Sequence, residues 1–180
     1  MELKSATFLE ALSAFILLIK NYQEKKYLPS SLSIQFFSKV IPYFCVLMWK
    51  YITFKATKGG ETFVAKEGDR VVGTMTVEFS SSIPCVEKIF AQEMKNLRIE
   101  ASSFAYIGSF AIRSKNSRTC LRMIREVENI LRWRRIEVGI CVVNPSHCSF
   151  YEKYGFKVIA QRENMEGLSN ATAVLLVIHA

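Results

Sequence analysis

The most informative segment of this sequence reads Val143-Asn144-Pro145-Ser146-His147-Cys148-Ser149-Phe150-Tyr151-Glu152-Lys153-Tyr154-Gly155-Phe156. The apolar run Ile136–Val143 leads into it and is typical of a buried strand. Ser146–Tyr154 is expected to form a short helix that ends at Gly155, because glycine readily adopts the left-handed conformation that follows a helix. Phe156–Gln161 then has the composition of a further strand. The segment therefore predicts a strand–helix–strand unit.

The rest of the chain continues this alternation of helices and strands. Apolar residues at helical spacing predict helices over Thr7–Gln23, Glu87–Arg98 and Ser117–Arg134. Runs rich in β-branched and apolar residues predict strands over Thr62–Lys66, Val71–Phe79, Ala105–Ile112 and Ala171–His179. This order predicts one domain, residues 1–180, built as a mixed α/β sheet with helices packed against it.

Residues 1–60 are expected to be a helical, aromatic-rich portion that precedes the sheet. Thr7 and Glu10 have the spacing of a capping box at the start of the first helix. Lys25–Phe37 is expected to be a loop, and Pro42 argues against a single uninterrupted helix over Val40–Phe54. Core packing is favoured for Val40–Phe54, while its interleaved lysines leave open a lid or an element on a membrane surface.

Composition restricts the location of the protein and the chemistry it can use. Half of the 180 residues are apolar, yet the longest stretches without a charged residue have 14 residues, too few to span a membrane. No secretory signal is recognised, so we expect a cytoplasmic protein. The five cysteines are scattered without a CxxC pair, so no metal site is expected.

The net charge of +8 is unevenly spread, since Arg113–Arg135 holds eight basic and two acidic residues. Such a run favours an acidic partner, and a solvated helix face explains it equally well. Nucleic acid is not expected as the partner, because the run has neither interleaved aromatic residues nor a DNA-binding motif.

The segment from Asn144 to Phe156 resembles the last helix of the GNAT superfamily of N-acyltransferases, in which a strand, Asn-Pro, a helix and Gly-Phe follow one another. The wider chain is most similar to the long-chain N-acyl amino acid synthases of the FeeM type, which are relatives of the acyl-homoserine-lactone synthases. This similarity is carried by Tyr27–Ser30, Arg70–Thr76, Ile83-Pro84, Ile89–Glu93, Leu97-Arg98, Ala105–Ile112 and Ala171–Leu176. It implies a mixed, mostly antiparallel sheet with helices on both faces and a splayed central pair of strands.

The resemblance also implies where an acyl thioester would react. Its carbonyl would meet backbone donors at Phe110, Ala111 and Ile112, between the splayed strands. Tyr151 aligns with a tyrosine that protonates the leaving sulfur in some members, although a packed aromatic ring is an equally good interpretation. Asn144 and Arg98 are further candidates for substrate binding.

One departure from the superfamily concerns the acyl donor. Enzymes that use acetyl-CoA carry a glycine-bearing loop that cradles the pyrophosphate, whereas Arg113–Cys120 contains no glycine. This favours an acyl carrier protein, with its acyl-phosphopantetheine thioester as co-substrate and no other cofactor. The basic residues assigned to the carrier protein and its phosphopantetheine are Arg113, Lys115, Arg118, Arg122 and Arg125.

A second departure concerns the base that activates the amine. Tyr106 stands where the synthases place a glutamate, and tyrosine, with an unperturbed pKa near ~10, is a poor base at neutral pH. Glu93 is then the nearest carboxylate that matches a family motif, unless water serves or the protein has lost its activity.

Four functions remain open on the sequence. The leading one is an N-acyltransferase that moves a long acyl chain from an acyl carrier protein to an amino acid. The second is an acetyltransferase dependent on acetyl-CoA, and the third is a non-catalytic module that binds acyl chains or the carrier protein. A basic protein that contacts a membrane peripherally is the weakest alternative, because it rests on charge alone.

Overall fold

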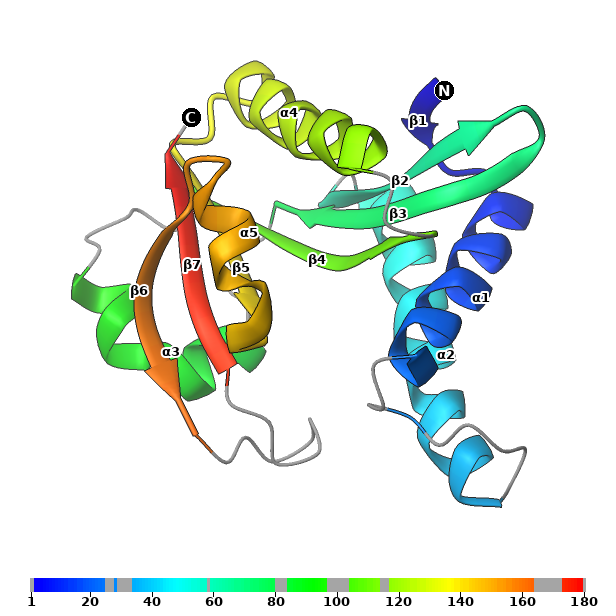
Figure 1. Ribbon diagram of the computed structural model, residues 1–180, viewed down its shortest axis with the longest axis horizontal. Helices are drawn as coiled ribbons and strands as arrows, with labels where there is room; N and C mark the ends of the chain where they lie inside the picture. Colours follow the sequence, from blue (N-terminus) through cyan, green and yellow to red (C-terminus); the bar gives the residue numbers. More distant parts are fainter. Residues whose placement is uncertain are drawn as a thin grey trace. The chain divides into compact units, whose positions relative to one another are not determined.

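The computed structural model describes residues 2–24, 28, 34–57, 59–79, 84–96, 104–113, 117–163 and 173–179 (Figure 1). The chain forms two compact units. Unit 1 comprises residues 1–77 and 109–123, and unit 2 comprises residues 78–108 and 124–180.

The described residues form a mixed sheet whose strands follow the order β1-β2-β3-β4-β5-β7-β6. β4 and β5 are parallel, whereas β1–β2, β5–β7 and β6–β7 are antiparallel. The mixed α/β class expected from the sequence is therefore confirmed. The elements are β1 (Glu2–Ser5), α1 (Phe8–Glu24), α2 (Ile34–Thr57), β2 (Gly60–Glu67), β3 (Arg70–Glu78), α3 (Pro84–Asn96), β4 (Phe104–Ile112), α4 (Ser117–Trp133), β5 (Val138–Val143), the short 3-10 helix η1 (Pro145–His147), α5 (Cys148–Glu152), β6 (Lys157–Arg162) and β7 (Ala173–His179).

Helix α1 of unit 1 begins with the capping box that the sequence predicts. The amide of Thr7 donates to Glu10 Oε2 over 3.0 Å, and the amide of Glu10 donates to Thr7 Oγ1 over 3.4 Å. The apolar side of the helix packs in one cluster with residues of α2, β2 and β3, including Ala14, Leu17, Leu47, Val64 and Val71. This cluster is a core of unit 1.

Helix α2 corrects the expectation for Pro42, because it runs without a break from Ile34 to Thr57. Proline lacks the amide hydrogen, so one helical hydrogen bond is lost there. Burial of Leu47, Met48 and Phe54 on one side of the helix offsets that loss. Tertiary packing thus overrides the local preference of one residue.

Unit 2 has its own core. Phe90 of α3, Phe104 of β4, Ile140 of β5 and Leu175 of β7 are buried together. Helix α3 lies against β6, and Glu93 of α3 forms an ion pair with Arg162 at the end of β6. None of the helices in the described ranges is long and apolar enough to cross a membrane.

Two local features correspond to expectations from the sequence: the pairing of the two central strands, and the helix that ends before Gly155. β4 pairs with β5 from Phe104–Val138 to Tyr106–Ile140, and farther along β4 Ser109 has a φ of 50°, in the left-handed region. The helix expected after β5 is split into η1 and α5, and Gly155 follows it with a φ of 87°. The positive φ explains the glycine, since side chains rarely adopt that conformation.

Candidate functional site

Tyr151 lies in α5 with only 7% of its surface exposed. Its ring is edge-on to Phe150 and to Phe156, with ring centres 5.3 Å away in each case. Its carbonyl accepts hydrogen bonds from the amides of Tyr154, over 2.9 Å, and Phe156, over 3.3 Å. The packed position is observed, and the role of the hydroxyl as a proton donor stays a prediction.

Asn144 has a structural task that the sequence analysis did not assign to it. Its Oδ1 accepts hydrogen bonds from the amide of Ser146, over 3.0 Å, and from Ser146 Oγ, over 2.8 Å. It therefore caps η1 and fixes the turn that leads from β5 into α5. This capping accounts for an asparagine at the end of the strand, and a contact with substrate stays a prediction.

The two candidates for the base, Tyr106 and Glu93, both belong to unit 2. Tyr106 is half-buried and packs in the cluster that includes Ile89 and Met94 of α3. The carboxylate of Glu93 is held by the guanidinium of Arg162 and is mostly covered, with 16% of its side chain exposed. The ion pair with Arg162 gives Glu93 a structural reason to be present.

The segment assigned to the thioester, Phe110–Ile112, is the end of β4 in unit 1. Ala111 is buried in the unit 1 core, while Phe110 and Ile112 are half-buried on the other side of the strand. The amide of the next residue, Arg113, donates to the carbonyl of Val72 in β3 over 2.7 Å. Arg98 and Lys115 lie outside the described residues.

Arg118, Arg122 and Arg125 are exposed on one face of α4, which we call the α4 arginine face. Their spacing of four and three residues places them on the same side of the helix. The opposite side is buried through Met123, Ile124 and Val127 among others. A partner could therefore contact all three arginines together.

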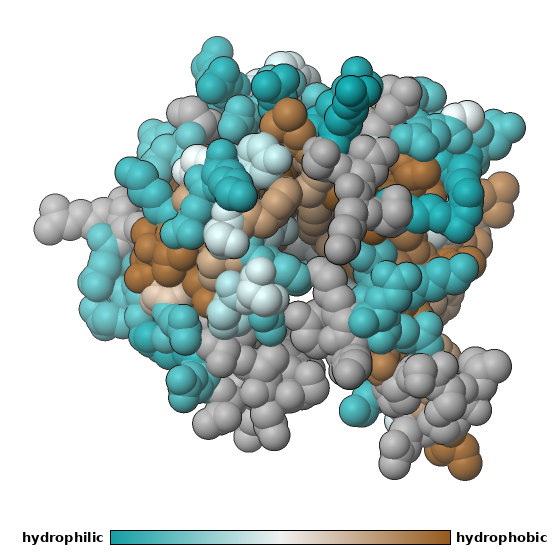
Figure 2. Space-filling model, in the orientation of Figure 1, coloured by the Kyte–Doolittle hydropathy of each residue, from teal (hydrophilic) through white to brown (hydrophobic). Residues whose placement is uncertain are grey.

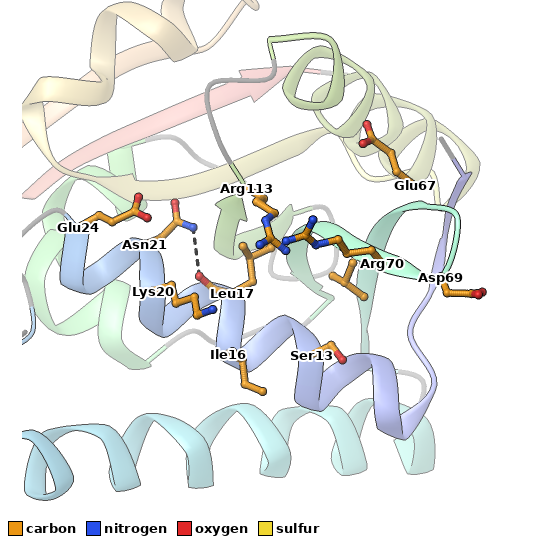
Figure 3. Close-up of a pocket in the computed structure, with 11 residues that line it drawn as sticks. Ser13, Ile16, Leu17, Lys20, Asn21, Glu24, Glu67, Asp69, Arg70 and Arg113 are labelled. Atoms are coloured by element: carbon orange, nitrogen blue, oxygen red, sulfur yellow. Dashed lines mark hydrogen bonds between the residues drawn. The ribbon is translucent and has the colours of Figure 1, made fainter. Parts of the chain in front are cut away.

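Unit 1 contains a pocket of about 730 Å³ between α1 and the hairpin of β2 and β3 (Figure 3). Its apolar lining comes from Ile16, Leu17 and Val71. The remaining lining is charged or polar and includes three cations and three carboxylates: Lys20, Arg70, Arg113, Glu24, Glu67 and Asp69. We call this the α1–hairpin pocket.

Arg70 and Arg113 point toward one another in this pocket (Figure 3). Arg70 begins β3 and Arg113 follows β4, and the bond from Arg113 to Val72 brings these strand ends together. Neither guanidinium has an ion-pair partner among the residues that the structure describes. Two neighbouring guanidinium groups without a carboxylate partner are suited to bind an anion.

Arg113, which the sequence analysis groups with the arginines of the α4 arginine face, lines this pocket. The pocket also contains candidate binding residues that the sequence analysis did not identify. No binding role is expected from the sequence for these residues: Lys20 lies in the expected helix Thr7–Gln23, Glu24 follows it, and Arg70 begins the segment Arg70–Thr76 that carries the family similarity. The hydrogen bond from Arg113 to Val72 places the end of β4 beside the start of β3, and the sequence pattern carries no signal of that neighbourhood.

Cys141 and Cys148 do not supply an activated nucleophile. Burial raises the pKa of the Cys141 thiol, and burial together with the charge of Glu152 raises that of Cys148. Both thiols are therefore kept in the protonated form, which is a weak nucleophile. Within the described ranges, no three His, Cys, Asp or Glu side chains are grouped to hold a metal ion.

Comparisons with known proteins identify the fold. The structure is similar to that of FeeM, an N-acyl amino acid synthase from uncultured soil microbes, with a TM-score of 0.72, 18% identity, and 99% of this chain and 91% of that chain covered. It is also similar to a probable acetyltransferase from Staphylococcus epidermidis, with a TM-score of 0.70, 15% identity, and 99% of this chain and 98% of that chain covered. A third similar structure is a ribosomal-protein-alanine N-acetyltransferase from Brucella melitensis, with a TM-score of 0.66, 13% identity, and 100% of this chain and 100% of that chain covered. The GNAT fold is thereby confirmed.

The family follows from the sequence match. No curated protein matches this chain. The model of the family described as N-acyl amino acid synthase FeeM matches residues 13–179, which is nearly the whole sequence. The chain therefore belongs to the FeeM family of N-acyl amino acid synthases.

Proposed function

We propose that this protein transfers a long-chain acyl group from the thioester of an acyl carrier protein to the amine of an amino acid. Family membership supports the acylation of an amino acid. The observation that carries the proposal for the donor is the α4 arginine face, where Arg118, Arg122 and Arg125 are exposed side by side. Acyl carrier proteins present an acidic helix, which such a face would attract.

The α1–hairpin pocket supports the proposal for the acceptor. A free amino acid carries a carboxylate and an ammonium group at neutral pH. Arg70 and Arg113 would bind the carboxylate through paired hydrogen bonds, and Glu24 would attract the ammonium group. The three carboxylates in the lining suit a ligand that carries a positive charge beside its negative one, as an amino acid does and a phosphate does not.

The reaction itself places few demands on side chains. The neutral amine attacks the thioester carbon, the carbon–sulfur bond breaks, and the amine proton passes to water or to a carboxylate. Backbone amides of Phe110–Ile112 would stabilise the oxyanion, and Tyr151 would give a proton to the departing thiolate. The ion pair of Glu93 with Arg162 favours water as the first proton acceptor.

The donor is tested by offering carrier proteins that bear acetyl, octanoyl or palmitoyl groups, and acetyl-CoA, each with the twenty amino acids. Mass spectrometry then identifies the products. We expect N-acyl amino acids from the longer chains on the carrier protein only. Product from acetyl-CoA would instead support an ordinary acetyltransferase, and binding of the carrier protein without any product would support a non-catalytic module.

The acceptor pocket is tested with Arg70→Gln and Arg113→Gln. Each variant should raise the KM for the amino acid about ten- to a hundredfold and leave the KM for the acyl donor within about twofold, because one of two hydrogen-bonded charges is lost. Arg135→Gln, an exposed arginine outside the pocket, is the matched control. An unchanged KM for the amino acid in both variants would exclude the pocket as the acceptor site.

A further inference from the structure

Helix α2 carries a largely apolar stripe that none of the described residues of unit 1 covers. It consists of Ile34, Ser38, Ile41, Cys45, Trp49, Ile52 and Ala56, which we call the α2 stripe, and all of these residues are exposed. Successive members are three or four residues apart, so they lie along one side of the helix. The exposed fractions are large, at 55% for Ile41, 70% for Trp49 and 57% for Ile52.

The stripe is distinct from the side of α2 that packs on the protein. Leu47, Met48 and Phe54 point into unit 1 and are nearly fully buried. On the packed side of the helix, the half-buried ring of Tyr51 contacts the ring of Phe8 of α1 at 6.1 Å between ring centres. Figure 2 shows apolar side chains among polar ones on the right of the view, where α1 and α2 lie. Apolar surface of this extent on a soluble protein marks an interaction site.

The charges on α2 indicate what kind of partner fits. The helix contains Lys39, Lys50 and Lys55 and no aspartate or glutamate. A second copy of the chain that packed stripe against stripe would offer the exposed Lys39 and Lys55 no carboxylate, because α2 itself carries none. A partner with an anionic outer layer over an apolar interior would pair with the lysines and bury the apolar side chains of the stripe.

We propose that the α2 stripe docks on the surface of an anionic lipid bilayer. Trp49, Ile41 and Ile52 enter the boundary between headgroups and acyl chains, and the lysines lie at the level of the anionic headgroups. The helix lies along the membrane and does not cross it. The proposal does not depend on the acyl-transfer reaction, because it uses no residue of the α1–hairpin pocket or of the α4 arginine face.

The apolar part of the proposal is tested by flotation with vesicles of phosphatidylcholine mixed with phosphatidylglycerol. Trp49→Ser combined with Ile52→Ser should lower the fraction that floats with the vesicles about tenfold or more, because two large apolar side chains no longer leave water. Both residues are exposed, so the variant should keep its thermal midpoint. Trp133→Ser is the matched control, since Trp133 is 75% exposed on α4, and it should float like the parent protein.

The charged part is tested with Lys39→Glu combined with Lys55→Glu, two exposed lysines of α2. This variant should lose its preference for vesicles with phosphatidylglycerol over vesicles of phosphatidylcholine alone, and added salt should weaken binding of the parent protein. In a Trp133→Phe background, Trp49 is the remaining tryptophan, and its emission should shift to shorter wavelength when vesicles are added.

Two results would overturn the proposal. One is equal flotation of the parent protein and the Trp49→Ser, Ile52→Ser variant. The other is a dimer of the parent protein, measured by sedimentation without lipid, that the same variant converts to a monomer. The second result would assign the stripe to another copy of the chain.

Discussion

Tyr151 is the single residue whose chemical role can be separated most clearly from its packing. Tyr151→Phe keeps the ring that lies between Phe150 and Phe156 and removes only the hydroxyl. We expect the turnover number to fall about a hundredfold, because the thiolate then leaves without a positioned proton donor. Donor binding should change little, and the thermal midpoint should show that the fold is intact.

The matched control for this substitution is Tyr154→Phe, since Tyr154 contacts the same Phe150 ring at 5.0 Å between ring centres. It should leave turnover nearly unchanged. Single-turnover measurements of acyl transfer report the chemical step directly. If Tyr151→Phe reacts as fast as the parent protein in that measurement, Tyr151 is a packing residue only.

Residues with local tasks could be predicted from the sequence, whereas partners distant in the chain could not. Gly155 was recognised because a helix end requires a positive φ, which the structure confirms at 87°. The pairing of Glu93 with Arg162 and the approach of Arg70 to Arg113 join segments far apart in the chain. Such pairs depend on strand order and register, which composition and periodicity do not encode.

At the scale of elements, Glu10 joins α1 to two strands. Its carboxylate accepts the Thr7 amide and forms ion pairs with Lys66 of β2 over 2.9 Å and Lys4 of β1 over 3.0 Å. The hydrogen bond from Thr7 and the ammonium of Lys66 lower the pKa of Glu10 from 4.5 to about 2. A lowered pKa in the folded state stabilises the fold above pH 4.5, and this contribution is lost as the pH falls toward 2.

Glu10→Gln is therefore expected to lower the free energy of unfolding by about 1 kcal/mol at neutral pH, because glutamine can keep the cap but not the ion pairs. The difference from the parent protein should shrink when urea denaturation is repeated at progressively lower pH. Glu137→Gln, an exposed glutamate before β5, is the control and should have little effect at either pH. A difference that stays constant with pH would mean that the charge of Glu10 does not stabilise the junction.

Helices and strands are predicted well where the sequence pattern is unambiguous, and less well where packing against distant residues determines whether a helix continues. The amphipathic pattern of Ser117–Arg134 predicts α4 almost to the residue, and the structure has it over Ser117–Trp133. Helix α2 was underestimated because Pro42 is a strong local signal, while its buried side contacts residues that lie elsewhere in the chain. Local propensity is a weak guide when tertiary packing opposes it.

At the scale of the whole molecule, a net charge of +8 attracts any acidic partner, so docking through one face must be distinguished from general attraction. Arg118→Glu, Arg122→Glu and Arg125→Glu together reverse the α4 arginine face. A second variant, Arg135→Glu with Lys153→Glu and Lys157→Glu, changes the net charge equally at exposed positions elsewhere. Comparing the two variants separates the location of the charge from its amount.

We expect the α4 variant to lower the association rate constant for the acyl carrier protein about ten- to a hundredfold at low salt, and the second variant to lower it far less. The difference should fade as salt rises, because exposed charges are screened beyond ~8 Å at physiological ionic strength. A short pantetheine thioester, which lacks the carrier protein, should react equally well with the parent and with both variants. Stopped-flow binding and product formation measure these quantities. If the α4 variant loses both substrates equally, the arginines contact the pantetheine arm or support the fold, and docking through this face is wrong.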